Sequence, residues 1–138
     1  MSAGSTTARV MSPNEISHEI IKAALKVHSA LGPGLLESAY RGCLAHELRK
    51  AGFRVEIEVL LPVVYDGIKM DFGYRIDMLV NDLVIVELKS AQEISRVHVA
   101  QILSYMKLSK KQLGLIINFN VLHLKDGRKR LVEGDGWK

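Results

Sequence analysis

Three charged side chains lie in or next to two apolar, strand-like runs of this sequence. Asp77 lies in the run 75–80, Glu87 lies in the run 83–88, and Lys89 follows directly. Two carboxylates that converge on one point repel each other unless a cation lies between them. An oxygen donor set without Cys or paired His favours Mg²⁺ or Mn²⁺ over Zn²⁺. With a lysine beside it, such a site would suit hydrolysis of a phosphodiester by a metal-activated water.

The pairing register of these two runs decides whether the charges meet. A two-residue turn at Asn81-Asp82 would leave Asp77 alone on an apolar face. A three-residue turn, or one bulge, places Asp77 opposite Glu87 instead. We prefer the second register because it gathers the charges on one face of the sheet. The other face would then be formed by Ile76, Met78, Val80, Val84, Val86 and Leu88, with Val80 opposite Val84.

A surface ion pair is the main alternative for Glu87 and Lys89. Residues two apart on a strand share a face, and many Glu-x-Lys pairs do no more than attract each other in solvent. Taken alone, the pair is better explained in this way. The nearby Asp77 and the apolar flanks favour a functional site.

Another carboxylate, Glu37, opens a helix predicted over residues 35–51. It lies three residues before Tyr40, and Tyr40, Leu44 and Leu48 form the apolar stripe of that helix. We therefore expect Glu37 on the core side. A first-turn Glu is also favoured by the helix dipole alone, which is the alternative explanation.

A later helix, predicted over residues 91–111 with a cap at Ser95, carries a polar seam. His98, Gln101 and Tyr105 lie on one side of it. This seam is expected to face the strand that bears Glu87. His98, like His28, is expected to be packed and hydrogen-bonded rather than catalytic.

The remaining pattern predicts the elements that position these residues. A helix should begin after Ser12, with a capping box closed by Glu15, and end at Gly32-Pro33-Gly34. Residues 53–65 alternate as a half-exposed strand that breaks, or lies at an edge, near Pro62.

The C-terminal third completes the predicted sheet. Residues 113–119 form an apolar strand, parallel to the Glu87 strand because a helix separates the two. Residues 121–132 are predicted as a small hairpin with a type I′ turn at Asp126-Gly127. The whole is an α/β domain with the order helix, helix, three strands, helix, strand and terminal hairpin.

Composition sets the broad class. The 138 residues are 48% hydrophobic and 25% charged, which suits one globular domain over residues 12–133 between a disordered tail (1–11) and a frayed end (134–138). No apolar run approaches the roughly 20 residues of a membrane helix, so we expect a soluble protein without a membrane partner. The single Cys43 fits a reducing compartment such as the cytoplasm.

The formal net charge of +4 permits a polyanionic partner. Basic residues cluster at the end of the predicted third helix and around the predicted terminal turn. The candidate nucleic-acid contacts are Lys107, Lys110, Lys111, Lys125, Arg128, Lys129 and Arg130. Charge runs are more often solvated surface, so phosphate contact is the less favoured interpretation of the charge alone.

Several short motifs resemble a known family. Gly34-Leu-Leu-Glu37-Ser-Ala-Tyr40 resembles the signature of the GxxExxY family. Asp77, Glu87-Leu-Lys89 and Gln101-Ile-Leu-Ser-Tyr105 resemble the motifs of RecB-type members of the PD-(D/E)xK nuclease superfamily. Each motif is weak alone, but their order over residues 14–132 is fairly specific.

The resemblance implies a restriction-endonuclease-like core, a mixed sheet flanked by helices, that cleaves DNA or RNA with Mg²⁺ or Mn²⁺. Asp77 and Glu87 would bind the metal, Lys89 would be catalytic, and Glu37 would add or orient a ligand. Gln101 and Tyr105 would complete the site or contact the nucleic-acid backbone. Gly34 would supply unusual backbone angles, and Tyr40 would pack with its hydroxyl bonded to a site carboxylate.

Two functions follow from these predictions. The first is a metal-dependent nuclease. The second is a binding module that keeps the fold without turnover and contacts a nucleic acid or a protein. The small size of the chain favours the second somewhat, and a homodimer would supply additional surface.

Overall fold

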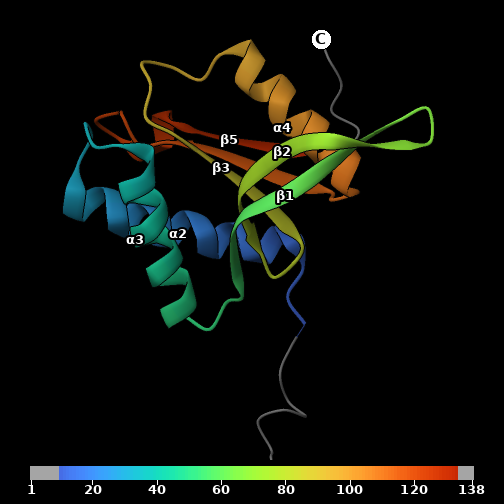
Figure 1. Ribbon diagram of the computed structural model, residues 1–138. Coiled ribbons are helices and arrows are strands. Elements are labelled where there is room, and N and C mark those ends of the chain that lie inside the picture. The colour runs from blue at the N-terminus through green and yellow to red at the C-terminus, as the bar shows by residue number, and fades with distance from the viewer. Residues whose placement is uncertain (1–9, 134–138) are drawn as a thin grey trace, which may run out of the picture.

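The computed structural model describes residues 10–133, which form a five-stranded sheet between two helical layers. Figure 1 shows α2 and α3 on one face of the sheet and α4 on the other. The elements are α2 (Pro13–Leu31), α3 (Glu37–Lys50), β1 (Val55–Tyr65), β2 (Ile68–Val80), β3 (Val84–Lys89), α4 (Arg96–Ser109), β4 (Leu113–Asn118), η1 (Leu124–Asp126) and β5 (Arg128–Val132). The α/β class is confirmed. The predicted tail and frayed end fall mainly on residues 1–9 and 134–138, outside the described range.

The strands lie in sequence order, β1-β2-β3-β4-β5. All neighbours pair antiparallel except β3 and β4, which are parallel as predicted. The crossover between them is α4, which packs so closely on β4 that a side chain at Gly114 would collide with Ile102 and Met106. This crossover places α4 on the face of the sheet formed by Ile85 and Ile116, the odd-numbered side of β3 to which Glu87 also belongs.

The register of β2 and β3 is the three-residue-turn register, with Val80 opposite Val84 and Met78 opposite Val86. Asn81 and Asp82 in the turn both have positive φ, a conformation that Asn and Asp tolerate. Side chains of β3 then alternate as predicted. Its even-numbered residues, Val84, Val86 and Leu88, pack in the core beneath α2 and α3.

One face assignment was wrong. Ile76 was expected beside Met78 and Val80, but it packs with Leu79 and Ile85 in the core on the α4 side. The alternation of β2 is interrupted at Asp77. There the regular pairing with β3 has ended, and Glu58 on β1 has φ of 53° and no ladder partner. This irregularity lies at the residue that carries the first candidate carboxylate.

The start of α2 confirms its sequence signals. Ser12 Oγ accepts from Glu15 N at 3.1 Å, and Glu15 Oε1 accepts from Ser12 N at 2.9 Å. Both backbone donors at the helix start are thereby satisfied. The helix ends at Gly32, with φ of 70°. Residues 91–95, predicted to be helical, form a loop before α4, because Ser95 caps that helix.

The predicted terminal hairpin was also wrong. Residues 124–126 form the short helix η1, and β5 pairs with β4 rather than with residues 121–125. Gly127 has a φ of −111°, whereas a type I′ turn needs positive φ at both central residues. Leu124 is drawn into the core, and a side chain at Gly127 would strike the carbonyl of Asn118.

None of the helices between residues 10 and 133 has both the length and the apolar character of a membrane crossing.

Candidate functional site

The candidate site lies where β2 and β3 separate. Regular backbone pairing between the two strands ends at Met78 and Val86. Beyond that point, hydrogen bonds from side chains to the backbone link the strands. Asp77 Oδ2 accepts from Leu88 N at 2.9 Å, and Glu87 Oε2 accepts from Asp77 N at 2.8 Å. Each carboxylate thus occupies the place of a missing ladder carbonyl. The two acids are fixed next to each other by the backbone itself.

Burial dominates the electrostatics of this pair. Glu87 is 5% exposed, and its pKa is raised to about 7, first by burial and then by the negative charge of Asp77. The hydrogen bond from Asp77 N and the charge of Lys89 oppose that rise, while Glu37 adds to it. A cation beside Asp77 and Glu87 would favour ionised Glu87.

Lys89 ends β3 and is half-buried. It lies opposite Asn118 in the parallel ladder, and Phe119 N donates to Lys89 O at 3.0 Å. The buried Asn118 side chain accepts from Ala91 N at 3.1 Å and donates to Ala91 O at 2.9 Å. Asn118 therefore fixes the chain just after Lys89. This role was not predicted, although an Asn at the end of an apolar strand is a usable signal because a buried amide needs hydrogen-bond partners.

Glu37 is the first residue of α3 and is exposed. The prediction that it lies on the core side of the helix was wrong. The buried stripe begins only at Tyr40, one turn later, so the first turn extends beyond the core. The negative charge of Glu37 still raises the pKa of Glu87, so the Glu37 carboxylate lies within electrostatic range of Glu87. We call the place where β2 and β3 separate, with Asp77 and Glu87, the fork.

The loop before Glu37 is held by Tyr40. Its ring stacks on Phe119 at 4.4 Å between centroids. Its hydroxyl donates to Gly32 O at 2.6 Å and accepts from Leu35 N at 3.0 Å. The expected bond from this hydroxyl to a site carboxylate was wrong, because the hydroxyl is committed to the loop. Gly34 has φ of 100°, so its predicted conformational role is confirmed.

Replacing Tyr40 with phenylalanine should lower the free energy of unfolding by about 1 kcal/mol, since two hydrogen bonds of one hydroxyl are lost while the ring stack remains. Urea denaturation measures this change. Tyr65→Phe is the matched control, because Tyr65 is 72% exposed. Equal stability of the two variants would show that the Tyr40 hydroxyl does not hold the loop.

Arg41 and Glu58 belong to the site but were not predicted. An Arg41 guanidinium nitrogen lies 3.0 Å from Glu58 Oε1, and the other lies 3.7 Å from Asp77 Oδ1. Arg41 lies one helical turn after Glu37, a spacing that places both side chains on one face of α3 and could have signalled it. Its guanidinium balances the charge of Asp77 and has the geometry to bind a phosphate.

Helix α4 contributes Gln101 and Tyr105. Burial and the charge of Glu87 raise the pKa of Tyr105 to about 12, with smaller contributions from Tyr74 and Asp77, while a hydrogen bond with Gln101 opposes the rise. The phenol is therefore protonated at neutral pH. The polar seam of α4 faces the acidic pair at Tyr105.

The two histidines serve the fold, as expected. His98 Nδ1 accepts from Ser95 N at 3.1 Å in a capping box, and one ring nitrogen of His28 lies 2.7 Å from Val121 O.

The candidate nucleic-acid contacts do not gather at the fork. Lys107, Lys110 and Lys111 lie at the end of α4, and Lys111 pairs with Asp82 in the β2–β3 turn at 3.1 Å, at the opposite end of β3 from Lys89. The other group is Lys125, Arg128, Lys129 and Arg130, in η1 and on edge strand β5, two strands from β3. Their contact with nucleic acid stays a prediction.

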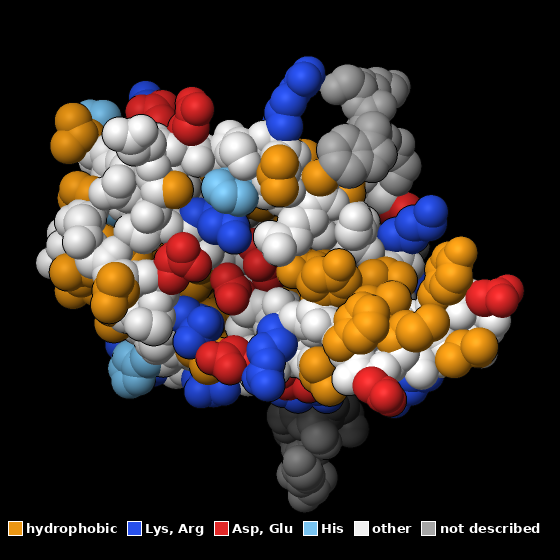
Figure 2. All heavy atoms as spheres, turned by 45° about the horizontal axis from the view of Figure 1, so that its top comes forward, with side chains coloured by type: hydrophobic (Ala, Val, Ile, Leu, Met, Phe, Trp, Pro, Cys, Tyr) orange, Lys and Arg blue, Asp and Glu red, His pale blue; other side chains and the backbone are white. Residues whose placement is uncertain are grey.

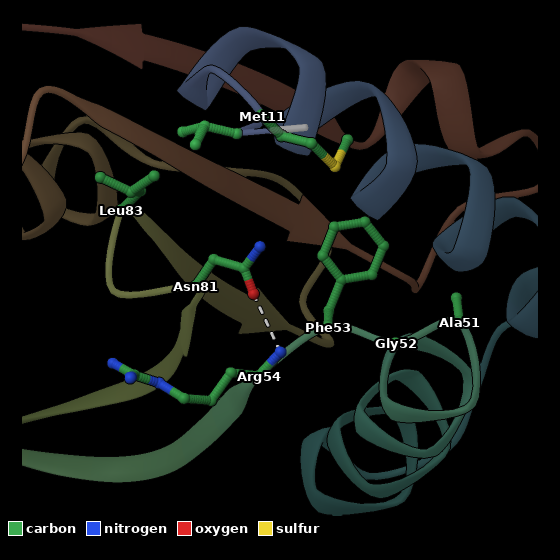
Figure 3. A pocket seen from close by; sticks show the side chains of 8 residues that line it. Met11, Ala51, Gly52, Phe53, Arg54, Asn81 and Leu83 are labelled. Carbon is green, nitrogen blue, oxygen red and sulfur yellow. Dashed lines mark hydrogen bonds between the residues drawn. The ribbon is translucent and has the colours of Figure 1, made fainter. Parts of the chain in front are cut away.

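A separate hollow lies beside the β2–β3 turn. Figure 3 shows Met11, Phe53, Asn81 and Leu83 around it, with Asn81 Oδ1 accepting from Arg54 N at 2.9 Å. Its lining includes no Asp, Glu, His or Lys. It lies at the far end of β3 from Lys89 and lacks the groups for acid-base or metal chemistry.

The acidic pair fits a hard divalent cation. Asp77 and Glu87 each use one oxygen for a backbone bond, which leaves the second oxygen of each as a candidate ligand. That oxygen of Asp77 lies 3.7 Å from Arg41, so a cation there would compete with this ion pair. Within residues 10–133, no group of three His, Cys, Asp or Glu side chains could hold a metal ion. Glu37 therefore does not complete a three-carboxylate set in this arrangement, and its role as a ligand stays a prediction.

Comparison with known proteins gives one match. Residues 14–131 match the sequence model of the PD-(D/E)XK nuclease superfamily. No curated protein and no solved structure matches the chain. The matched range includes the fork, the polar side of α4 and the loop at Gly34. The described fold, a mixed sheet flanked by helices, agrees with a restriction-endonuclease-like core.

Proposed function

Because this chain belongs to the PD-(D/E)XK nuclease superfamily, we propose that it hydrolyses phosphodiester bonds of DNA or RNA at the fork of β2 and β3. Within the superfamily, the motif at Gly34, Glu37 and Tyr40 favours the GxxExxY family. The observation that carries the proposal is the reciprocal bonding of Asp77 and Glu87, with Lys89 two residues further on the same strand.

Asp77 and Glu87 would hold Mg²⁺ or Mn²⁺, which supplies positive charge at the scissile phosphate and lowers the pKa of a bound water. Lys89 orients the attacking water and offsets negative charge as the transition state forms. The Tyr105 hydroxyl, protonated at neutral pH, can donate to a phosphate oxygen, and Gln101 fixes its orientation. Arg41 is placed to bind a neighbouring phosphate.

A binding module without turnover is the second candidate. It is favoured by Arg41, whose guanidinium already partly neutralises Asp77, and by the separation of Glu37 from the acidic pair. Such a module would hold nucleic acid or protein with or without a divalent ion.

The test is a metal-dependence assay on purified full-length protein, with single-stranded, duplex and branched DNA and RNA as substrates. Cleavage is expected with Mg²⁺ or Mn²⁺ and not with EDTA. If every substrate stays intact with both metals, hydrolysis is refuted. Binding without hydrolysis would then support the module.

A further inference from the structure

The two strands β1 and β2 continue far beyond the rest of the sheet. Strand β2 has 13 residues, but only Met78 to Val80 pair regularly with β3. The remainder pairs with β1 alone and turns at Asp66-Gly67, where φ is 55° and 72°. Residues 60–75 thus form a two-stranded arm, the bright green hairpin that projects in Figure 1.

This arm is apolar on its surface. Figure 2 shows hydrophobic side chains gathered on the projecting part of the molecule, next to a group of acidic ones. The large hydrophobic residues exposed there are Leu60 (63%), Val64 (56%), Tyr65 (72%), Ile68 (60%), Phe72 (67%) and Tyr74 (47%). By the register of β1 and β2, the exposed side chains of Tyr65, Ile68, Phe72 and Tyr74 share one face of the arm, and Leu60 and Val64 lie on the other. The first group is an exposed apolar patch, which is typical of a binding surface.

The aromatic residues of the arm lead to the site. The Tyr74 ring lies 5.5 Å from the Tyr105 ring, and Glu87, Asp77 and Tyr74 all raise the pKa of Tyr105. Phe72 follows two residues further out, and Tyr65 lies across from Ile68 near the tip. A chain whose phosphodiester lies at Asp77 and Glu87 would therefore have its next nucleotides beside Tyr74 and Phe72.

We propose that this aromatic arm binds unpaired bases of the nucleic-acid substrate by stacking, so that the protein acts on single strands or on unpaired ends. The inference rests on the proposed function for the identity of the polymer as nucleic acid. Aromatic rings stack on any exposed base, at a strength that supports binding without sequence preference.

Charge favours bases over phosphates as the groups that the arm contacts. Its charged side chains are Asp66, Lys69, Asp71 and Arg75, two of each sign. A duplex presents phosphates outward and hides the faces of its bases, so a neutral aromatic arm gains little from it. Pro62 lies on edge strand β1 and lacks the N–H needed to extend the sheet there, which disfavours pairing of the β1 edge with a second copy of the chain.

The test measures binding apart from cleavage. Full-length protein is titrated against a labelled 20-nucleotide single strand and the matching duplex, with EDTA present, by fluorescence anisotropy. We expect the single strand to bind more tightly than the duplex. Phe72→Ala and Tyr74→Ala should each weaken single-strand binding about tenfold and leave duplex binding unchanged. Circular dichroism checks that each variant is folded.

A pair of substitutions at one position separates stacking from general apolar contact. Phe72→Trp keeps an aromatic face and should bind the single strand as the parent does, whereas Phe72→Leu keeps apolar bulk and should bind as weakly as Phe72→Ala. Equal binding by the leucine variant and the parent would overturn the proposal. So would sedimentation that shows a dimer for the parent and a monomer for Phe72→Ala, because the arm would then bind a second copy.

The binding result and the cleavage result test the arm and the proposed hydrolysis separately. Ring-dependent binding of single strands without any cleavage would refute the proposed hydrolysis and retain the arm. Metal-dependent cleavage that Phe72→Ala and Tyr74→Ala leave unchanged, together with unchanged single-strand binding, would refute the arm and retain the proposed hydrolysis.

Discussion

Replacing Lys89 with alanine should reduce the rate of metal-dependent cleavage by about a thousandfold and leave the fold intact. The ammonium group lies on the strand that carries Glu87, close enough for its charge to lower the pKa of that carboxyl. Its loss removes the group that would orient the water and offset charge at the phosphorus. Cleavage of a fluorescent oligonucleotide in Mg²⁺ at pH 8 measures the rate.

The fold should survive because the backbone of Lys89, rather than its side chain, makes the structural contacts. Its ladder position opposite Asn118 and its carbonyl bond to Phe119 N do not involve the ammonium group. Lys22→Ala is the matched control, with the same change of net charge at an exposed position on α2. Comparable rate losses in both variants would place the effect in overall charge, not in the site. Full activity of Lys89→Ala would remove Lys89 from the mechanism.

The register of β2 and β3 shows what the sequence can determine. A slip of one residue would have buried a lone carboxylate in apolar surface, so burial cost alone selected the pairing of Val80 with Val84. The same burial cost predicted that Asp77 and Glu87 lie next to each other. The prediction for Ile76 was wrong because strict alternation assumes an unbroken strand. The alternation of β2 is interrupted at Asp77, where Glu58 on the neighbouring strand β1 has a φ of 53°.

The errors near the C-terminus have a similar origin. Asp126-Gly127 is a common hairpin turn, yet β5 gains more by pairing with the already buried β4, and Leu124 gains by entering the core. Neither the pairing of β5 with β4 nor the burial of Leu124 can be predicted from the turn propensity of two residues. Arg41 was missed for a related reason: its partners, Asp77 and Glu58, lie on strands whose position relative to α3 is set by packing around Tyr40 and Leu44.

Glu87→Gln should stabilise the protein without divalent ions, and only at higher pH. The pKa of Glu87 is raised from 4.5 to about 7 in the fold, mainly by burial. The native state therefore binds more protons than the unfolded state between these values, and stability falls as pH rises through this window. Glutamine can still accept from Asp77 N but carries no charge. Above pH 7 the variant should exceed the parent by about 3 kcal/mol in the free energy of unfolding, and below pH 4.5 the two should agree.

Urea denaturation at several pH values with EDTA present measures this difference, and comparison of two variants cancels the contribution of all other titrating groups. Glu93→Gln, at an exposed position in the loop before α4, is the control and should follow the parent at every pH. Mg²⁺ at pH 8 should then stabilise the parent more than Glu87→Gln, because a cation offsets the charge that burial penalises. A constant difference between parent and Glu87→Gln across pH would show that burial does not raise the pKa of Glu87. A cation beside Asp77 and Glu87 would then have no buried charge to offset.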